Sequence, residues 1–398
     1  MSFKNNSTIV AALLHAYQPP NQTTKILDRI AKNCYLPFAQ ILEKDPSLKV
    51  TLNINASLTE LLEDEYGVII EKYAELAQNG QIEFLDSGAY HPILPLLSQK
   101  EAKLQIKLNN KINSRIFGSI WNPRGFWPPE LAVSENLAIL IESLGYDYMI
   151  IPEISISSNS PFPAPLLTRL PVHPNAPKLA LINRNRDISN SISFKKYSNI
   201  EDIREHIFRL KNLQPEGVVV FATDLETFGE HHRHYERFLA KILKSFNSVT
   251  ISQLLNIPRQ PIVEFRSSSW STSDEDLYRD IPFPLWAYPG NSIHELLNFH
   301  GDLLSEIAEC LLLKKNESDY EVKIALKAIA KAQYSCQTWW ASTKDHFSKE
   351  IIQKGFLAQK SALEQALMAI GSESDHIILK GVSEKLERRL ARYLARIR

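Results

Sequence analysis

The chain has 398 residues, of which 45 are acidic and 45 are basic, and 44% are hydrophobic. This length and apolar content predict a large core and two domains. A formal net charge of zero argues against nucleic acid or an anionic membrane as the partner and favours neutral small molecules or glycans.

Two further features concern the compartment. The N-terminal apolar run at residues 9–14 is too short for a signal peptide or a membrane span. Three cysteines, Cys34, Cys310 and Cys336, are an odd number without metal-type spacing, which favours reduced thiols. We therefore expect a cytoplasmic protein.

Seven short apolar runs predict strands, most of them separated by helical segments. Such an order is typical of parallel strands with crossover helices, which close most naturally as an α/β barrel. The domain predicted from these runs covers residues 1–260. The runs lie within residues 8–20, 49–66, 80–97, 125–134, 146–153, 178–185 and 217–232.

The chain changes character after Pro258 and Pro261. Residues 265–291 are irregular and rich in Ser, Pro and aromatic residues, which is more typical of a functional loop than of a linker. From residue 292 onward the apolar spacing is helical. Residues 261–398 are therefore predicted to form an active-site loop region and a helical bundle packed beside the barrel mouth.

Four polar residues stand at or just after predicted strand ends: His15, His91, Glu130 and Asp224. In barrels of this kind the chemistry lies at the carboxyl ends of the strands. We therefore expect these four side chains to converge at one mouth.

Glu130 belongs to the segment GFWPPELAVS, residues 125–134. Trp127 supplies a flat apolar surface, and Pro128 and Pro129 fix the backbone in front of the carboxylate. The following residues have the spacing of an amphipathic helix that ends at Gly145. This pattern predicts that Glu130 lies in a first helical turn, where the alternative role is simple stabilisation of the helix dipole.

Asp224 follows the apolar run 218–221. Burial and a second anion nearby raise the pKa of such a carboxyl group, which makes Asp224 a candidate general acid, while Glu130 stays ionised as a nucleophile. Two carboxyl groups flanking a sugar acetal are what glycoside hydrolysis needs. Aromatic faces such as Trp127, Trp339 and Trp340 suit stacking on sugar rings.

The histidines leave other hypotheses open. His231, His232 and His234 cluster after Asp224, so a metal-dependent polysaccharide deacetylase has to be considered. Adjacent histidines point apart, however, and no metal or other cofactor is expected. A non-catalytic glycan-binding protein is a third alternative.

Four segments in this order resemble family 57 of the glycoside hydrolases. They are HAYQP at residues 15–19, GQIE at 80–83 with HPILPL at 91–96, WPPE at 127–130, and DLETFGEHH at 224–232. Two departures stand out. Tyr17 replaces the second histidine of the first segment, and the last family region, here SCQTWWAS at 335–342, has aromatic residues but no acid.

The resemblance implies an irregular seven-stranded (β/α) barrel followed by a helical domain. It also implies retaining chemistry on the α-glycosidic bonds of α-glucans or maltooligosaccharides, by hydrolysis or by transfer, with Glu130 as nucleophile and Asp224 as acid/base. The oligomeric state is left open. The predicted substrate-binding residues are His15, Gln18, Glu83, His91, Trp127, His231, Trp339 and Trp340.

Overall fold

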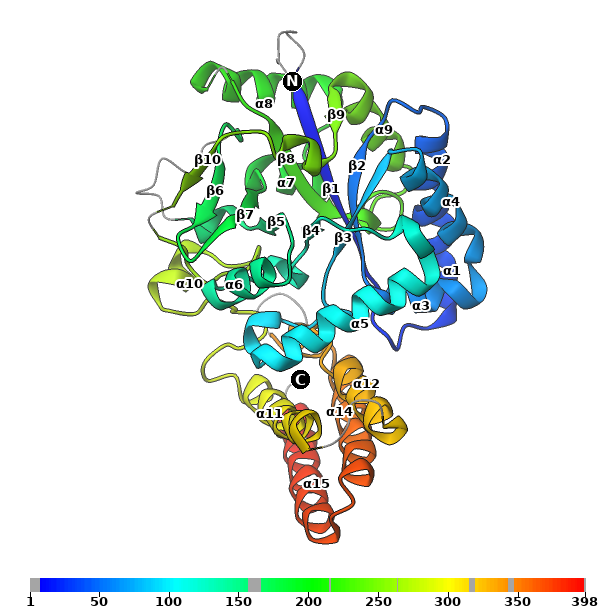
Figure 1. Cartoon of the computed structure of the whole chain (residues 1–398), viewed down its shortest axis with the longest axis vertical. Coiled ribbons are helices and arrows are strands. Elements are labelled where there is room, and N and C mark those ends of the chain that lie inside the picture. The colour runs from blue at the N-terminus through cyan, green and yellow to red at the C-terminus, as the bar shows by residue number, and fades with distance from the viewer. Residues whose placement is uncertain are drawn as a thin grey trace.

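The computed structural model describes residues 8–156, 166–214, 216–262, 264–314, 319–342 and 347–396. Its centre is a curled sheet in which neighbouring parallel strands run in the order β7, β5, β4, β3, β2, β1, β8 (Figure 1). Their bounds are β1 Ile9–Ala16, β2 Val50–Ile54, β3 Ile82–Asp86, β4 Gly125–Phe126, β5 Tyr148–Ile151, β7 Ala176–Asn183 and β8 Val219–Asp224. These seven strands confirm the predicted barrel class.

Three short strands extend this sheet. β6 (Leu170–His173) runs antiparallel to β7, β10 (Arg259–Pro261) pairs with β6, and β9 (Asn247–Val249) pairs with β1. Strand pairing does not continue from β8 to β7, although the N–H of Asn185 donates to the Val220 carbonyl at 2.7 Å. The barrel is therefore irregular at this seam.

Alternating residues of the strands build two cores. On β1, Val10, Ala12 and Leu14 pack outward against helices, while Ala11 and Leu13 pack into the barrel interior, as the period of two along a strand requires. The helices of this part are α1 Thr24–Ile30, α2 Leu36–Glu43, α3 Ala56–Glu65, α4 Gly67–Gln78, α5 Gln99–Phe117, α6 Glu135–Ser143, α7 Arg186–Ser193, α8 Ile200–Leu213, α9 Glu236–Ser245 and α10 Asp274–Tyr278.

The C-terminal part is helical and lies beneath the barrel in Figure 1, with α5 between the two. Its helices are α11 Ser292–Lys314, α12 Tyr320–Ala332, α13 Cys336–Trp339, α14 Lys349–Ile370 and α15 Glu373–Arg396. Gln105 on α5 donates to the Ala330 carbonyl at 2.9 Å, and Lys327 on α12 pairs with Glu60 on α3 at 2.6 Å. These contacts fix the helical part to the barrel.

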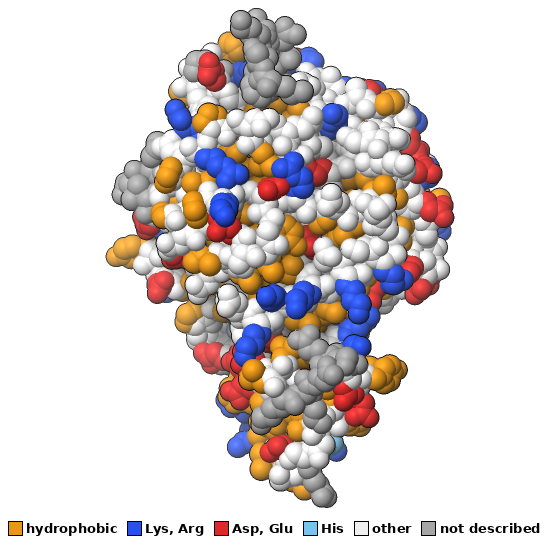
Figure 2. All heavy atoms as spheres, in the orientation of Figure 1, with side chains coloured by type: hydrophobic (Ala, Val, Ile, Leu, Met, Phe, Trp, Pro, Cys, Tyr) orange, Lys and Arg blue, Asp and Glu red, His pale blue; other side chains and the backbone are white. Residues whose placement is uncertain are grey.

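The solvent-facing side of α5 is basic. Lys103, Lys107 and Lys111 are exposed along it, and Figure 2 shows basic side chains gathered where α5 crosses the face of the molecule. None of the described helices is long and apolar enough to cross a membrane.

Gly125 on β4 lets a buried tyrosine reach across the barrel interior. A Cβ atom at this position would lie 2.1 Å from ring atoms of Tyr148, whose hydroxyl donates to Glu83 at 2.7 Å.

We expect Gly125→Ala to lower the free energy of unfolding by about 1–3 kcal/mol through overpacking, measured by urea denaturation. Gly67→Ala is the control, because nothing lies within 4 Å of its added Cβ. Equal stability of the two variants would contradict the prediction.

Candidate active site

Glu130 lies in a tight turn that follows β4 at the barrel mouth. Pro129–Leu131 form a single 3-10 turn, in which Glu130 has φ 57° and Leu131 has φ 46°. The indole N–H of Trp270 donates to Glu130 Oε2 at 2.9 Å, and the backbone N–H of Trp270 donates to the Glu130 carbonyl at 3.2 Å. The loop after β10 therefore fixes both the backbone and the carboxylate of Glu130.

The prediction that Glu130 opens a helix is wrong. Helix α6 begins at Glu135, and Ser134 caps it by accepting from the N–H of Leu137 at 3.2 Å. The segment before it pairs instead with a distant loop, because Val133 forms a β-bridge with Ser268. Left-handed backbone in non-glycine residues costs roughly 1–2 kcal/mol per residue and concentrates at functional sites. The turn of Glu130 is such a place.

Asp224 is the last residue of β8, at the same level as His15 on the neighbouring β1. The positive charge that acts on it is that of Arg184, which follows β7 and is 4% exposed. The Arg184 guanidinium donates to the Ala222 carbonyl at 3.1 Å and lies 5.5 Å from the ring centroid of Trp270. Arg184 and Trp270 were not among the predicted site residues, although Arg184 follows an apolar strand as Asp224 does.

The pKa values of both carboxyl groups are raised. Burial raises the pKa of Glu130 to about 8, helped by the charge of Asp224 and opposed by the Trp270 hydrogen bond. Burial also raises the pKa of Asp224 to about 6, against the attraction of Arg184. The expected rise at Asp224 is therefore present. Glu130, which was expected to stay ionised, has the higher pKa, because the charge of Asp224 adds to the effect of its burial, whereas Arg184 offsets the effect of burial at Asp224.

A third carboxylate, Glu226, was missed by the sequence analysis. It is 6% exposed and accepts from the Gln18 amide at 3.2 Å, the Tyr17 N–H at 3.2 Å and the Tyr35 hydroxyl at 2.5 Å. Burial and the charge of Asp224 raise its pKa to about 7. Its position two residues after Asp224, in the turn that directly follows β8, is the signal that could have found it.

His15 and His91 form one hydrogen-bonded chain whose direction is set by Asn53. The Asn53 amide nitrogen donates to the Leu85 carbonyl at 3.2 Å, so its oxygen accepts from His15 Nδ1 at 2.7 Å. His15 Nε2 is then an acceptor, and His91 Nε2 donates to it at 2.9 Å. Both rings are neutral, because burial lowers the pKa of His15 to about 4 and that of His91 well below its usual range.

The neutral His91 ring leaves Nδ1 as an acceptor. This atom lies 2.9 Å from the Ser335 hydroxyl, which must therefore donate, and 3.7 Å from Glu130 Oε1. The N–H of Ser335 also donates to the His91 carbonyl at 3.1 Å. Ser335, in the helical part, thus supplies the hydrogen-bond donor for the acceptor nitrogen of a histidine beside Glu130.

We expect Ser335→Ala to leave His91 Nδ1 buried without a donor, since His91 is only 1% exposed. The free energy of unfolding should fall by about 1–3 kcal/mol, and kcat/KM should fall with it as His91 loses its position. Urea denaturation and steady-state kinetics measure both effects. Ser114→Ala is the control, because that hydroxyl donates to the Asn110 side chain within α5, at 3.3 Å. A variant as stable and active as the control would contradict this account of the chain.

Four aromatic rings are layered across the mouth. Tyr17 stacks on His91 with centroids 3.9 Å apart, and His15 stacks on Trp127 at 5.1 Å. Trp127 is fully buried, so it forms the floor beneath His15 and presents no open face to a sugar. The Tyr17 hydroxyl lies 3.5 Å from the Cys336 thiol. The C-terminal region therefore reaches the site through Ser335 and Cys336.

The structure distributes the remaining predicted residues unevenly. Gln18 is buried at the site beside Glu226, and His231 is exposed in the turn that follows it. Trp339 packs on the apolar cluster that includes Ile93 and Trp286, whereas Trp340 packs within the helical part.

The structure does not bring Glu83 to this mouth. Glu83 is level with Thr51 on β2, two residues below the level of His15 and Asn53. It accepts from the Thr51 hydroxyl, the Ser252 N–H and the Tyr148 hydroxyl. Three donors therefore hold the Glu83 carboxylate below the level of His15.

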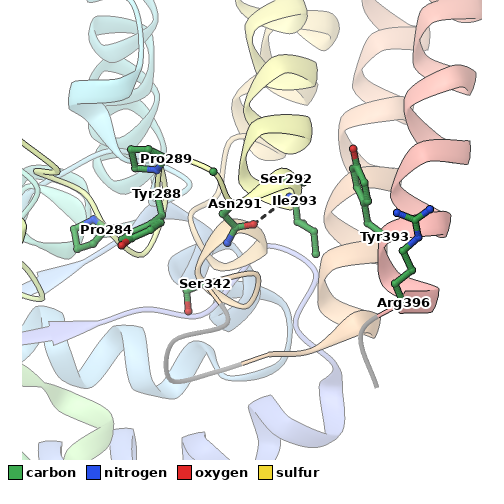
Figure 3. Close-up of a pocket in the computed structure, with 10 residues that line it drawn as sticks. Pro284, Tyr288, Pro289, Asn291, Ser292, Ile293, Ser342, Tyr393 and Arg396 are labelled. Carbon is green, nitrogen blue, oxygen red and sulfur yellow. Dashed lines mark hydrogen bonds between the residues drawn. The ribbon is translucent and has the colours of Figure 1, made fainter.

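A separate pocket of about 610 Å³ lies in the helical part. Figure 3 shows it between Tyr288, on the segment before α11, and Tyr393 on α15. None of its lining residues belongs to the carboxylate site. In the part of the chain that the structure describes, no three His, Cys, Asp or Glu side chains form a group that could hold a metal ion.

Family membership follows from comparison with known proteins. Residues 3–266 match the model of glycosyl hydrolase family 57, which is more than half of the chain. The chain belongs to glycosyl hydrolase family 57. The resemblance carried by its sequence motifs is thereby confirmed.

The family 57 relatives are distant. Alpha-amylase 1 of Dictyoglomus thermophilum is 29% identical over 140 residues, which are 35% of this chain and 20% of that one. An alpha-amylase of Pyrococcus furiosus is 23% identical over 246 residues, or 61% and 37% of the two chains. The matches thus span little more than a third of these relatives at most. The crystal structure of a GH57-type branching enzyme from Pyrococcus horikoshii superposes with a TM-score of 0.68 at 17% identity, covering 96% of this chain and 94% of that one, which shows the shared fold.

Proposed function

We propose that this chain is a retaining glycoside hydrolase or transglycosylase that acts on α-glucans, with Glu130 as nucleophile and Asp224 as acid/base. The observation that carries the proposal is that Glu130, in the turn after β4, and Asp224, at the end of β8, are close enough for the charge of Asp224 to raise the pKa of Glu130. Related family members named alpha-amylase and 4-alpha-glucanotransferase support the substrate class. Three unpaired cysteines fit a cytoplasmic location.

The proposed reaction has two displacement steps. Glu130 attacks the anomeric carbon and forms a glycosyl ester, while Asp224 gives its proton to the leaving glycosidic oxygen. Asp224 then takes a proton from water or from a sugar hydroxyl, which attacks the anomeric carbon and releases Glu130. Water gives hydrolysis, and a sugar gives transfer.

The proposed reaction uses Glu130 ionised and Asp224 protonated, although Glu130 has the higher pKa in the ligand-free site. Positive charge developing at the anomeric carbon favours the ionised form of Glu130, and the glycosidic oxygen favours a proton on Asp224. The Trp270 N–H, which already donates to Glu130, stabilises the ionised form. Substrate therefore places the proton where the reaction uses it.

The test is incubation with maltooligosaccharides, with products separated by length and their anomeric configuration followed by proton NMR. The proposal expects new α-anomers first, and products longer than the substrate if transfer occurs. Products with the β configuration would overturn the retaining assignment. Binding without turnover would support the glycan-binding alternative.

We expect kcat/KM to depend on pH as a bell. Below the lower pKa, about 6, both carboxyl groups are protonated and the nucleophile is lost; above the upper pKa, about 8, both are ionised and the acid is lost. The maximum should therefore lie between about pH 6 and 8, measured with substrate well below KM. A profile that stays flat from pH 5 to 9 would contradict a coupled pair.

A further inference from the structure

The proposed reaction does not use Glu226, a buried acid at the same site. Glu226 lies in the turn that follows β8, two residues after Asp224. Its carboxylate is held at the end of β1, where Oε1 accepts from the Tyr17 N–H, the Gln18 amide and the Tyr35 hydroxyl. All three partners are donors, so they stabilise the ionised form of this carboxyl group.

Asp224 lies within electrostatic reach of two other acids. In the register of β1 and β8, Asp224 is opposite His15, and the carboxylate of Glu226 binds β1 two residues further on, at Tyr17. The charge of Asp224 raises the pKa of Glu226, and it also raises that of Glu130. Because Coulomb repulsion is mutual, an ionised Glu226 and an ionised Glu130 both act on Asp224.

Repulsion among these acids affects where a single proton resides. When two of the three are ionised, a proton on Glu130 or on Glu226 leaves Asp224 charged beside a second anion. A proton on Asp224 instead leaves the charges on Glu130 and Glu226, and the pKa of Glu130 is raised by burial and by Asp224. This last arrangement therefore has the weakest repulsion. It acts against the attraction of Arg184 for an ionised Asp224.

The other titratable side chains beside the three acids are neutral near pH 7, because burial raises the pKa of the thiols and phenols and lowers that of the histidines. They are Cys34, Tyr35 and Tyr73 beside Glu226, Tyr17, His91 and Cys336 beside Glu130, and His15 opposite Asp224. Further charges act on Arg184 from Glu153 and Arg186, and on Cys34 from Glu230 and Glu236. Arg184, with a pKa of about 10, stays charged while the three acids titrate.

We propose that the ionised carboxylate of Glu226 favours a proton on Asp224 over one on Glu130, so that Glu226 is a positioning residue for the catalytic proton. The inference rests on the proposed function, because the first displacement needs Glu130 ionised and Asp224 protonated. Glu226 forms no bond to the sugar in this account. It acts above about pH 7, where it is ionised, and this lies within the range of about pH 6 to 8 in which the pair holds one proton.

The test is carbon-13 NMR of the full chain labelled at the aspartate carboxyl carbons, with the Asp224 signal identified by its loss in Asp224→Asn. In the wild type we expect Asp224 to titrate in two steps, one near pH 6 and one near pH 8, because ionised Glu226 keeps part of it protonated. In Glu226→Gln, whose amide oxygen can accept from the same donors, Asp224 should lose its proton in one step near pH 6. Identical titration curves overturn the proposal.

A second variant and a control make this test specific. Tyr35→Phe removes one donor from Glu226, which then ionises at a higher pH, so less Asp224 should be protonated between about pH 7 and 8 than in the wild type. Glu230→Gln removes a charge four residues further along, where Glu230 pairs with Arg29 at 2.5 Å, and should leave the titration of Asp224 unchanged. Circular dichroism checks that each variant folds.

Kinetics separate this inference from a merely structural role of Glu226. On maltooligosaccharides, Glu226→Gln should lower kcat/KM about tenfold and move its pH optimum to lower pH. The leaving group of α-glucosyl fluoride needs no proton, so kcat/KM for this substrate at about pH 9, where Glu130 is ionised in both proteins, should change by less than about twofold. Equal losses on both substrates would overturn the proposal. A wild type with the two-step titration but no turnover would support the proton placement and contradict the proposed function.

Discussion

Replacing Glu130 with Gln is expected to abolish turnover of maltooligosaccharides, with kcat lower by at least about 10³-fold. The amide keeps the shape of the side chain but cannot form the glycosyl ester that divides the reaction into two steps. Product formation over hours, measured by chromatography, gives the rate. Glu135→Gln is the matched control, because Glu135 lies nearby in the first turn of α6 and its side chain is 49% exposed.

A small anion should partly restore the reaction when Glu130 is shortened to Ala. With α-glucosyl fluoride as substrate, azide can enter the space that the carboxylate leaves and attack the anomeric carbon while fluoride departs. One displacement inverts the centre, so the product expected is β-glucosyl azide, identified by proton NMR. Formation of α-glucosyl azide by Glu130→Ala, or turnover by this variant at the wild-type rate without azide, would contradict the assignment of Glu130 as nucleophile.

Much of the site could be predicted because parallel strands bring their carboxyl ends to one edge. His15 and Asp224 follow apolar runs that are far apart in sequence, yet the register of β1 and β8 puts them directly opposite each other. The apolar runs were also sufficient to predict the seven-stranded barrel. Both successes rest on the same physics, since buried parallel strands are continuously apolar and polar residues mark where they end.

What could not be predicted depends on loops and on depth along the strands. Trp270 contacts Glu130 from a loop 140 residues later in the chain, and Ser335 contacts His91 from a loop 244 residues later. No local sequence pattern encodes such contacts. Because side chains alternate between the two faces of a strand, the sequence predicts that Glu83 points into the barrel. It does not predict how far along the strand Glu83 lies relative to His15. The left-handed turn at Glu130 is fixed by pairing with the loop at Ser268, against the helical pattern of the sequence around it.

The boundary at residue 260 stays a prediction. The loop after β10 contributes Ser268 to a β-bridge and Trp270 to the Glu130 carboxylate. Ser335 binds His91 from the helical part. A cut at residue 260 would therefore remove three groups that hold the barrel mouth, so the barrel segment alone should not be expected to retain activity.

Asp224→Asn is expected to separate the two steps of the reaction. On maltooligosaccharides, whose leaving oxygen needs a proton, kcat/KM should fall about 10²- to 10⁴-fold. On α-glucosyl fluoride the leaving group needs no proton, so formation of the glycosyl ester should be far less affected and its breakdown should become slow. A burst of fluoride release followed by a slower steady rate would show this accumulation. Asp274→Asn, at the exposed start of α10, is the control and should behave as the wild type.

Azide distinguishes the role of Asp224 from that of Glu130. In Asp224→Ala the glycosyl ester on Glu130 still forms, and azide, which needs no general base, attacks it in place of water. Two inversions then give α-glucosyl azide, the opposite anomer to that expected from Glu130→Ala. Two carboxyl groups whose pKa values are both raised cannot be assigned from titration alone, whereas the configuration of the azide product reports which of them bonds to the sugar. If both variants gave the same anomer, the two carboxylates would not have the separate roles proposed here.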